Sequence, residues 1–186
     1  MPFTATAFPG LFIFEPVVFK DERGYFFESY SEQAFEQQGI SIRFVQDNQS
    51  FSRRGVIRGL HYQLEPYAQT KLVRVLQGRV LDVALDIRVG SPTFGRYMSI
   101  ELSAENKKQF LIPRGFAHGF SVLSETAELS YKCDGLYNKA SEGGILYNDP
   151  ALGIDWQVPA AEAIVSSKDQ ELPLMAQCRN TFTFIG

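Results

Sequence analysis

The chain contains few histidines and few cysteines, and it has no long apolar run. Among its 186 residues there are two histidines, two cysteines and one tryptophan. No apolar stretch approaches the roughly 20 residues that a membrane-spanning helix needs. Residues 1–7 have neither a positive flank nor a long apolar stretch, so they do not resemble a signal peptide. These features predict a cytoplasmic protein that does not contact membranes.

The charge and the cysteine content narrow the choice of partners and compartment. The formal net charge of −3 argues against general affinity for nucleic acids. An anionic substrate would therefore need a local cluster of basic side chains. Cys133 and Cys178 are able to pair, but free thiols are the expectation for a cytoplasmic chain.

The length and composition are those of a single globular domain, residues 1–186, that is rich in β-strands. The hydrophobic content of 45% and the charged content of 21% are ordinary for a chain with a packed core. The aromatic content of 13% favours strands. Alternation of apolar and polar residues predicts strands at residues 11–14, 17–19, 71–76, 79–88, 97–102, 109–112, 120–123 and 127–132.

Helix signals are weak, and many short strands at regular spacing are typical of a β-sandwich or barrel. A short helix is expected at residues 31–38, where Ser31 is able to cap it and Gly39 to end it. A second is expected at residues 160–164. From residue 147 onward the chain is richer in proline and aspartate, which predicts loops and short helices wrapped around the barrel.

Both histidines lie in tracts that are rich in glycine and arginine. Residues 58–63 read Arg-Gly-Leu-His-Tyr-Gln, and residues 113–120 read Pro-Arg-Gly-Phe-Ala-His-Gly-Phe. Histidine is the side chain that ordinarily titrates nearest to physiological pH. His61 and His118 are therefore the first candidates for a general base.

The second tract resembles the metal-binding motif of the cupins, which are small jelly-roll barrels, but the first tract does not. The match consists of Pro113, Gly115 and His118. Gln63 stands where that motif has its second histidine, and Lys71 stands where it has a glutamate. An ammonium group repels a cation, and a metal needs three or more converging ligands. We therefore expect the cupin scaffold without a metal.

In place of a metal, His61 and Lys71 form a pair suited to proton abstraction next to a carbonyl group. His61 would remove the proton, and the Lys71 ammonium would stabilise the enolate. Each also fits a plain structural position, His61 as a hydrogen-bonded core residue and Lys71 as a solvated strand start. Tyr131 is either a core aromatic side chain or a phenol that returns a proton. Asp169 is either a loop carboxylate or the partner that orients His61.

Two polar segments are candidates for binding phosphate or a base. Arg23 lies in the acidic and aromatic segment 21–28, where it either belongs to a charged hairpin or clamps phosphate through bidentate contacts. Residues 46–50, Gln-Asp-Asn-Gln-Ser, either form a turn or hydrogen-bond to the edge of a base or sugar.

Taken in order, these tracts closely resemble the dTDP-4-dehydrorhamnose 3,5-epimerase family. The matching segments are residues 21–28, 44–48, 55–63, 71–75, 113–120, 131–133, 148–150 and 167–169. The resemblance implies a mainly β, cupin-type jelly-roll fold, a homodimer, and no metal or redox cofactor. It implies inversion of C3 and C5 of dTDP-4-dehydro-6-deoxy-D-glucose to give dTDP-4-dehydro-L-rhamnose, in the dTDP-rhamnose pathway that supplies cell-surface polysaccharide.

The resemblance also implies a role for individual residues. Four would be catalytic: His61 as the base, Asp169 as its orienting carboxylate, Lys71 as the group that stabilises the C4 enolate, and Tyr131 as the acid on the other face. The residues expected to hold the nucleotide, the diphosphate or the sugar are Arg23, Phe26, Glu28, Gln46, Asp47, Asn48, Arg58, His118, Tyr137, Glu142 and Lys168.

The chain departs from the family pattern beside the expected sugar site. Leu136 replaces an aromatic residue, and Gly143 and Gly144 suggest a more flexible backbone. These departures leave open an epimerase of a related dTDP-4-keto-6-deoxy sugar that acts at C3 alone or C5 alone. Two alternatives from other classes are a metal-dependent cupin enzyme and a nucleotide-sugar binding module that keeps Arg23 and Arg58 without catalysis.

Overall fold

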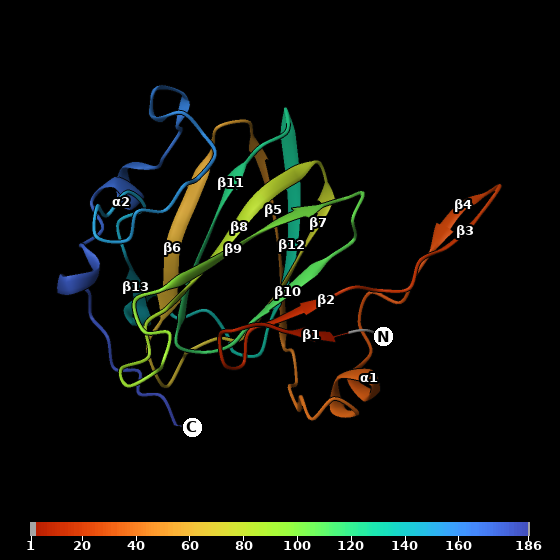
Figure 1. Ribbon diagram of the computed structural model, residues 1–186, viewed down its shortest axis with the longest axis horizontal. Coiled ribbons are helices and arrows are strands. Elements are labelled where there is room, and N and C mark those ends of the chain that lie inside the picture. The colour runs from red at the N-terminus through yellow and green to blue at the C-terminus, as the bar shows by residue number, and fades with distance from the viewer. Residues whose placement is uncertain (1–2, 186) are drawn as a thin grey trace.

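A computed structural model describes residues 3–185, and it consists of two antiparallel β-sheets packed face to face (Figure 1). The six-stranded sheet has the order β1 (Phe3–Ala5), β2 (Phe12–Phe14), β10 (Gln109–Ile112), β7 (Lys71–Gln77), β12 (Thr126–Cys133) and β5 (Gln46–Arg53). The five-stranded sheet has the order β13 (Glu142–Gly144), β6 (Ile57–Gln63), β11 (Phe116–Val122), β8 (Arg79–Asp86) and β9 (Tyr97–Ser103). The mainly β, cupin-type sandwich expected from the sequence is confirmed.

Few residues are helical, and a separate hairpin stands apart from both sheets. The helical segments are α1 (Glu32–Glu36), α2 (Ser167–Gln170) and the short 3-10 turns η1 (Lys139–Ser141), η2 (Ala160–Glu162) and η3 (Met175–Gln177). The hairpin consists of β3 (Phe19–Asp21) and β4 (Gly24–Phe26), and it projects away from the sandwich (Figure 1). No helix within residues 3–185 is long and apolar enough to cross a membrane.

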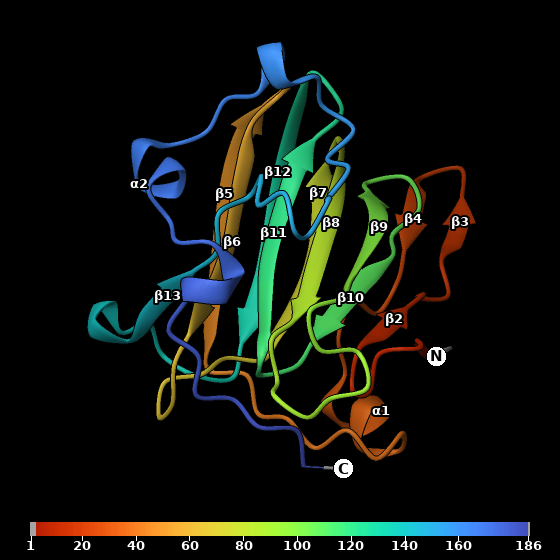
Figure 2. The same cartoon turned by 60° about the vertical axis from the view of Figure 1, so that its left-hand side comes forward.

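Strand β8 buries apolar side chains on both of its faces, and each face belongs to a different layer of the core. Its alternate residues Val80 and Ala84 pack between the sheets, whereas Leu81, Val83 and Leu85 pack on the outer face of the five-stranded sheet. That outer face is covered by the C-terminal third of the chain, which runs in front of β6 and β11 in Figure 2. The expectation that this third wraps the barrel is therefore confirmed.

Several element predictions need correction. The strand predicted at 17–19 lies at residues 19–21, and that at 120–123 begins at Phe116. The expected helix at 160–164 is a single 3-10 turn, whereas α1 begins after Ser31 as predicted. The interpretation of residues 46–50 as a turn is wrong, because they belong to β5 and pair along the whole of β12. This edge strand has polar side chains on both faces, so its sequence lacks the apolar alternation that marks a strand.

Asp86 is a buried carboxylate that fixes the loop after β8. It is fully buried and accepts hydrogen bonds from Arg88 Nε (2.9 Å), Arg88 Nη2 (2.7 Å), Ser91 Oγ (2.6 Å) and Thr93 Oγ1 (2.7 Å). Burial acts to raise the pKa of Asp86, but these donors outweigh burial, and the pKa lies below its ordinary value. The guanidinium of Arg88 is itself held between the rings of Phe116 and Phe184.

We expect Asp86→Asn to lower the free energy of unfolding at pH 7 by about 3 kcal/mol, because it leaves the buried Arg88 charge unpaired. A depressed folded-state pKa gives stability that is present above the unfolded value of 3.8 and is lost as the pH falls through the folded value. The difference between variant and wild type should therefore shrink below about pH 4 in urea titrations. Glu101→Gln, which breaks an exposed pair with Arg79, is the control and should cost less than about 1 kcal/mol. A difference that does not change with pH would contradict the role of the Asp86 charge.

Candidate active site

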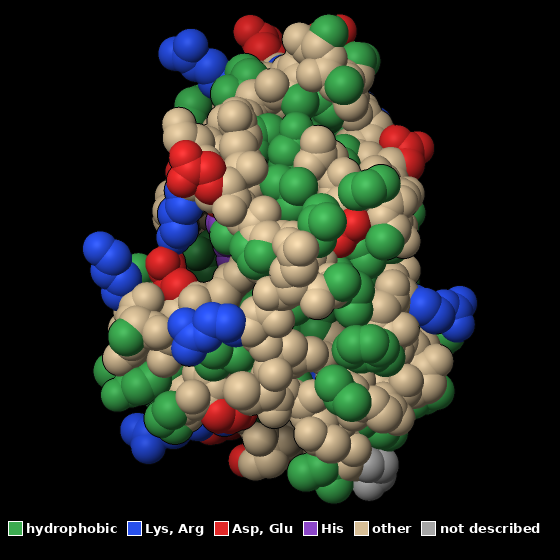
Figure 3. Space-filling model, turned by 90° about the vertical axis from the view of Figure 1, so that its left-hand side faces the viewer, with side chains coloured by type: hydrophobic (Ala, Val, Ile, Leu, Met, Phe, Trp, Pro, Cys, Tyr) green, Lys and Arg blue, Asp and Glu red, His purple; other side chains and the backbone are tan. Residues whose placement is uncertain are grey.

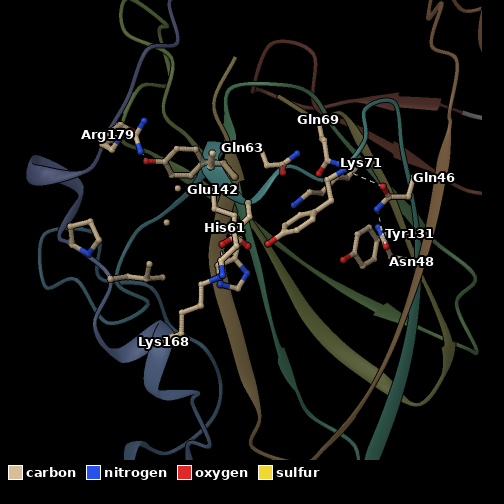
Figure 4. Close-up of a pocket in the computed structure, with 18 residues that line it drawn as sticks. Gln46, Asn48, His61, Gln63, Gln69, Lys71, Tyr131, Glu142, Lys168 and Arg179 are labelled. Carbon is tan, nitrogen blue, oxygen red and sulfur yellow. Dashed lines mark hydrogen bonds and ion pairs between the residues drawn. The ribbon is translucent and has the colours of Figure 1, made fainter. Parts of the chain in front are cut away.

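A cavity of about 730 Å³ opens between β6, β12 and the C-terminal segment. On the face that carries α2, basic and acidic side chains stand around a hollow in which histidine is visible (Figure 3). The lining residues include eight of those singled out by the sequence, namely Gln46, Asn48, His61, Lys71, Tyr131, Tyr137, Glu142 and Lys168. They come from both sheets and from the segments that follow them (Figure 4).

His61 on β6 is oriented by a carboxylate that lies 108 residues later in the chain. Its Nε2 donates to Asp169 Oδ1 at 2.8 Å, and the backbone N–H of Gly59 donates to Asp169 Oδ2 at 3.2 Å. Asp169 is buried within α2, and Ser166 caps that helix. Burial acts to raise the pKa of Asp169, but the hydrogen bond from His61 and the other donors lower it below its ordinary value. Because Nε2 is occupied, Nδ1 is the ring nitrogen that remains for a substrate.

A close approach of two backbones sets the position of His61. Gly59 has a φ of +122°, and a Cβ on it would lie 2.6 Å from the Cα of Gly119 on β11. Glycine is therefore required where β6 and β11 meet. Beyond this point, His61 and His118 lie opposite each other in the ladder between the two strands.

His118 makes a second pair with a carboxylate, but in a closed environment. Its Nε2 lies 2.9 Å and 3.0 Å from the two carboxylate oxygens of Asp82, and both side chains are buried. Asp82 lies on β8, on the face directed between the sheets. In contrast to His61, whose side chain is 41% exposed, His118 is 8% exposed and does not line the cavity.

Lys71 and Tyr131 supply the opposite wall from the six-stranded sheet. Lys71 begins β7 beside Cys133 of β12, and Tyr131 lies two residues before Cys133. Burial lowers the pKa of Lys71, whereas the nearby Cys133 and Asp82 act in the other direction. Burial raises the pKa of Tyr131, with the charge of Arg58 opposing it, so the phenol keeps its proton at neutral pH.

The third wall is made by β13 and the residues around it. Lys168 Nζ donates to Glu142 Oε2 at 2.8 Å, which lowers the pKa of Glu142. Gly143 and Gly144 pair with β6, and a Cβ on Gly143 would lie 2.3 Å from the ring of Tyr62. The two glycines thus allow a tight wall within a regular strand.

Comparison with known proteins decides the family. A model of the dTDP-4-dehydrorhamnose 3,5-epimerase family matches residues 5–177. The chain is 55% identical over 165 residues to the enzyme of that name from Shigella flexneri, covering 88% of this chain and 90% of the relative. The chain belongs to the dTDP-4-dehydrorhamnose 3,5-epimerase family. It is therefore an enzyme of an isomerase family, as the sequence tracts predicted.

Solved structures of this epimerase family support the same assignment. A dTDP-6-deoxy-D-glucose-3,5-epimerase from Legionella pneumophila, in complex with dTDP-4-keto-L-rhamnose, is 50% identical with a TM-score of 0.90, covering 95% of this chain and 93% of that one. A 3'-monoepimerase from Streptomyces bikiniensis, in complex with dTDP-quinovose, is 33% identical with a TM-score of 0.86, covering 92% and 86%.

The structure places the remaining residues expected from the epimerase family outside the cavity. Arg23 and Phe26 belong to the projecting hairpin, where Arg23 pairs with Asp21, and Glu28 follows that hairpin in the chain. Asp47 pairs with Lys132 at 3.0 Å and does not line the cavity. Three further residues do not line the cavity: Asp169 is bonded to His61, Arg58 to Ser52 and Phe51, and His118 to Asp82.

The described residues do not bring together a set of side chains that could bind a metal ion. Within residues 3–185 no three side chains of His, Cys, Asp or Glu converge. Gln63, at the position of a second cupin histidine, accepts a hydrogen bond from Asn138 N and donates one to the carbonyl of Tyr67. Both cysteines are free, as expected. The sequence interpretation missed the lining residues Tyr62, Gln69, Lys139, Leu172, Pro173 and Arg179.

We expect Lys71 to titrate below an ordinary lysine, because burial removes its ammonium from water and favours the neutral amine. Reductive methylation with ¹³C-formaldehyde and NMR would follow its methyl signal, assigned by its loss in Lys71→Gln. The reference is free Nα-acetyl-lysine methylated in the same way. A midpoint at or above this reference would contradict the expectation.

Proposed function

We propose that the chain is a cofactor-independent epimerase that inverts C3 and C5 of dTDP-4-dehydro-6-deoxy-D-glucose and gives dTDP-4-dehydro-L-rhamnose. The observation that carries the proposal is that His61 and Tyr131 come from opposite sheets and line one cavity. Inversion needs one group to remove a proton from one face of the sugar and another to return a proton to the opposite face. Two groups on facing sheets meet this requirement.

The C4 ketone makes both steps possible. His61 Nδ1 takes the proton from C3 or C5, and the electron pair of the broken C–H bond moves onto the C4 oxygen as an enolate. The Lys71 ammonium stabilises this oxyanion in a largely desolvated site, where charge has its greatest effect. The Tyr131 hydroxyl then gives its proton to the same carbon from the other face. Exchange with water returns both groups to their starting states.

The wider setting is also part of the proposal. We place the reaction in dTDP-rhamnose biosynthesis, which supplies cell-surface polysaccharide. We place it in the cytoplasm, where Cys133 and Cys178 stay free thiols. The contacts of Gln46 and Asn48 with substrate stay a prediction, supported by their amide groups at the Lys71 end of the cavity (Figure 4).

A second candidate within the same chemistry is epimerisation at C3 alone. Leu136 is 61% exposed and precedes Tyr137 at the cavity, at the position where the family pattern has an aromatic residue. The likeness to the Streptomyces bikiniensis 3'-monoepimerase keeps this candidate open. We favour the double epimerase because the relatives at 55% and 50% identity bear 3,5-epimerase names.

We expect the wild-type chain to exchange the C3 and C5 protons of dTDP-4-keto-6-deoxyglucose for deuterium in D₂O, followed by NMR. His61→Asn should lower both exchange rates by roughly 10²- to 10⁴-fold, because it removes the general base. Its affinity for dTDP should stay close to wild type. Exchange at C3 alone would select the mono-epimerase, and no exchange with the substrate bound would contradict the whole proposal.

Tyr131→Phe is the matched variant for the acid. We expect it to retain exchange, since His61 still removes and returns protons on its own face. Inversion should fall strongly, because no group then protonates the opposite face. The ratio of exchange to product, measured in one NMR series, separates the two roles. Equal loss of both would contradict the assignment of Tyr131 as the acid.

We also propose a homodimer in which the β3–β4 hairpin reaches the cavity of the partner. The hairpin presents Phe19 (63% exposed), Tyr25 (58%) and Phe26 (71%), which is much apolar surface for one short element. It holds Arg23, a residue expected to bind substrate, outside its own cavity. A second copy is the occupant that would give this residue a substrate.

We expect Arg23→Glu and His61→Asn each to be nearly inactive as homodimers. A heterodimer of the two, purified with different affinity tags, should recover about half of the wild-type activity, because one of its two symmetric sites then has both native residues. Light scattering would confirm the dimer. If the hairpin instead served its own chain, both sites of the heterodimer would be defective and no activity would return.

A further inference from the structure

The loop that follows β12 receives hydrogen bonds from three glutamine side chains. β12 ends at Cys133 and η1 begins at Lys139, and we call residues 134–138 between them the cavity loop. The loop carries Tyr137, which lines the cavity. Leu136 and Tyr137 are 61% and 56% exposed, so burial of apolar surface contributes little to fixing their positions. The position of the loop therefore depends mainly on its hydrogen bonds.

Gln63 contacts the backbone on both sides of Tyr137. Its Nε2 donates to the carbonyl of Leu136 at 3.3 Å, and its Oε1 accepts from Asn138 N at 2.6 Å. The same Nε2 also donates to the carbonyl of Tyr67 at 2.8 Å, so both amide N–H groups and one oxygen lone pair are used. Gln63 is only 6% exposed, and water therefore does not readily replace these bonds if the side chain is removed.

Two further glutamines hold the same loop. Gln46 Oε1, on β5, accepts from Tyr137 N at 3.1 Å, and Gln69 Nε2 donates to the carbonyl of Gly135 at 2.7 Å. With Gln63, they give each of residues 135–138 one backbone hydrogen bond to a glutamine that lines the cavity. An amide has two N–H groups and two lone pairs, so this use of Gln46 is compatible with its predicted contact with substrate.

Gln63 also connects the loop to the strand that carries the base. His61 and Gln63 are two residues apart on β6, so their side chains leave the same face, and both line the cavity. In β13, Glu142 lies opposite Gln63. The hydroxyl of Tyr137 reaches this wall, where partial removal from water and a hydrogen bond with Glu142 raise its pKa. The loop and the base are thus fixed relative to each other through neighbouring residues of β6 and β13.

We propose that Gln63 is a positioning residue for the reaction, because it holds the cavity loop so that Tyr137 stays against the bound sugar. Gln63 acts through the loop backbone and transfers no proton. The inference rests on the proposed function, since it takes the sugar to lie beside His61 and Tyr137. At the position where a metal-binding cupin has its second histidine, this chain thus has an amide that holds a loop.

The first test follows the ring of Tyr137 by ¹⁹F NMR after incorporation of 3-fluorotyrosine, without substrate. The signal is assigned by its loss in Tyr137→Phe. In Gln63→Leu, we expect it to move towards the signal of free 3-fluorotyrosine and to narrow, because the loop loses two hydrogen bonds and the ring becomes more mobile. Gln63→Glu keeps the acceptor for Asn138 N but places a carboxylate oxygen against two carbonyls, so it should move the signal in the same direction.

Asn106 provides the matched control. Its side-chain amide also makes three hydrogen bonds to a loop backbone. Its Oδ1 accepts from Ser103 N at 3.1 Å and from Lys108 N at 3.0 Å, and its Nδ2 donates to the carbonyl of Glu101 at 3.0 Å. Asn106 does not line the cavity. Asn106→Leu should therefore lower the urea midpoint of unfolding but leave the ¹⁹F signal and the activity near wild type.

The second test is a double-mutant cycle on epimerisation, followed by NMR. Gln63→Leu should lower kcat/KM by about 10- to 100-fold, the cost expected when a group that contacts the substrate is misplaced. Tyr137→Ala removes the side chain that is held. In the Tyr137→Ala background, Gln63→Leu should therefore lower kcat/KM by no more than about twofold further, because residues that act as one unit are not additive.

Two results would overturn the inference. Losses that multiply in the double variant would show that Gln63 stabilises the fold without positioning Tyr137. A ¹⁹F signal that is unchanged in Gln63→Leu and Gln63→Glu would show the same. If Gln63→Leu does not fold, Gln63→Glu carries both tests. A wild-type chain that exchanges no substrate protons would instead overturn the proposed function, and the ¹⁹F result, which needs no substrate, tells the two failures apart.

Discussion

The hydrogen bond between His61 and Asp169 is the interaction on which the site depends. It joins β6 to a helix that begins 106 residues further along the chain, at Ser167. Asp169 is buried, so its carboxylate needs donors, and it obtains them from His61 and from Gly59 N. The residues that follow Asp169 then run along the cavity, and Leu172 and Pro173 form part of its wall. The orientation of the His61 ring and the shape of this cavity wall therefore both depend on one contact.

His61 and His118 each pair with a carboxylate, but the two pairs lie in different surroundings. Each uses Nε2 to bind a carboxylate, yet Asp169 approaches from outside the sheet and Asp82 from the adjacent strand β8. The first pair leaves a ring that is partly exposed to the cavity, and the second is enclosed by the core. A buried pair of this kind is costly to desolvate, and the mutual contact of the two side chains offsets part of that cost. The nearby charge of Asp82 also acts on Lys71.

Much of this arrangement was predictable from the sequence, and the failures have physical causes. The alternation in residues 79–88 correctly places Val80 and Ala84 on one face and Leu81 on the other. The prediction that His61 and Lys71 face one cavity is confirmed, because both line it. By contrast, β5 was missed because an edge strand does not need an apolar face. Arg179 was missed because it reaches the cavity from a C-terminal segment far from the other lining residues in sequence, so no local sequence pattern marks it. Its contact with Tyr62 is equally non-local.

The glycine pair in β13 limits which side chains fit at this wall of the cavity. The ring of Tyr62 occupies the space that a side chain at Gly143 would fill, and Leu172 does the same at Gly144. A larger residue at either glycine position therefore requires a smaller one at its partner. The side-chain sizes at residues 62 and 143 are therefore coupled, as are those at residues 144 and 172. The width of the cavity at this wall therefore depends on two residues at a time. A larger side chain at Gly143 or Gly144 alone would clash with Tyr62 or Leu172 and destabilise the fold.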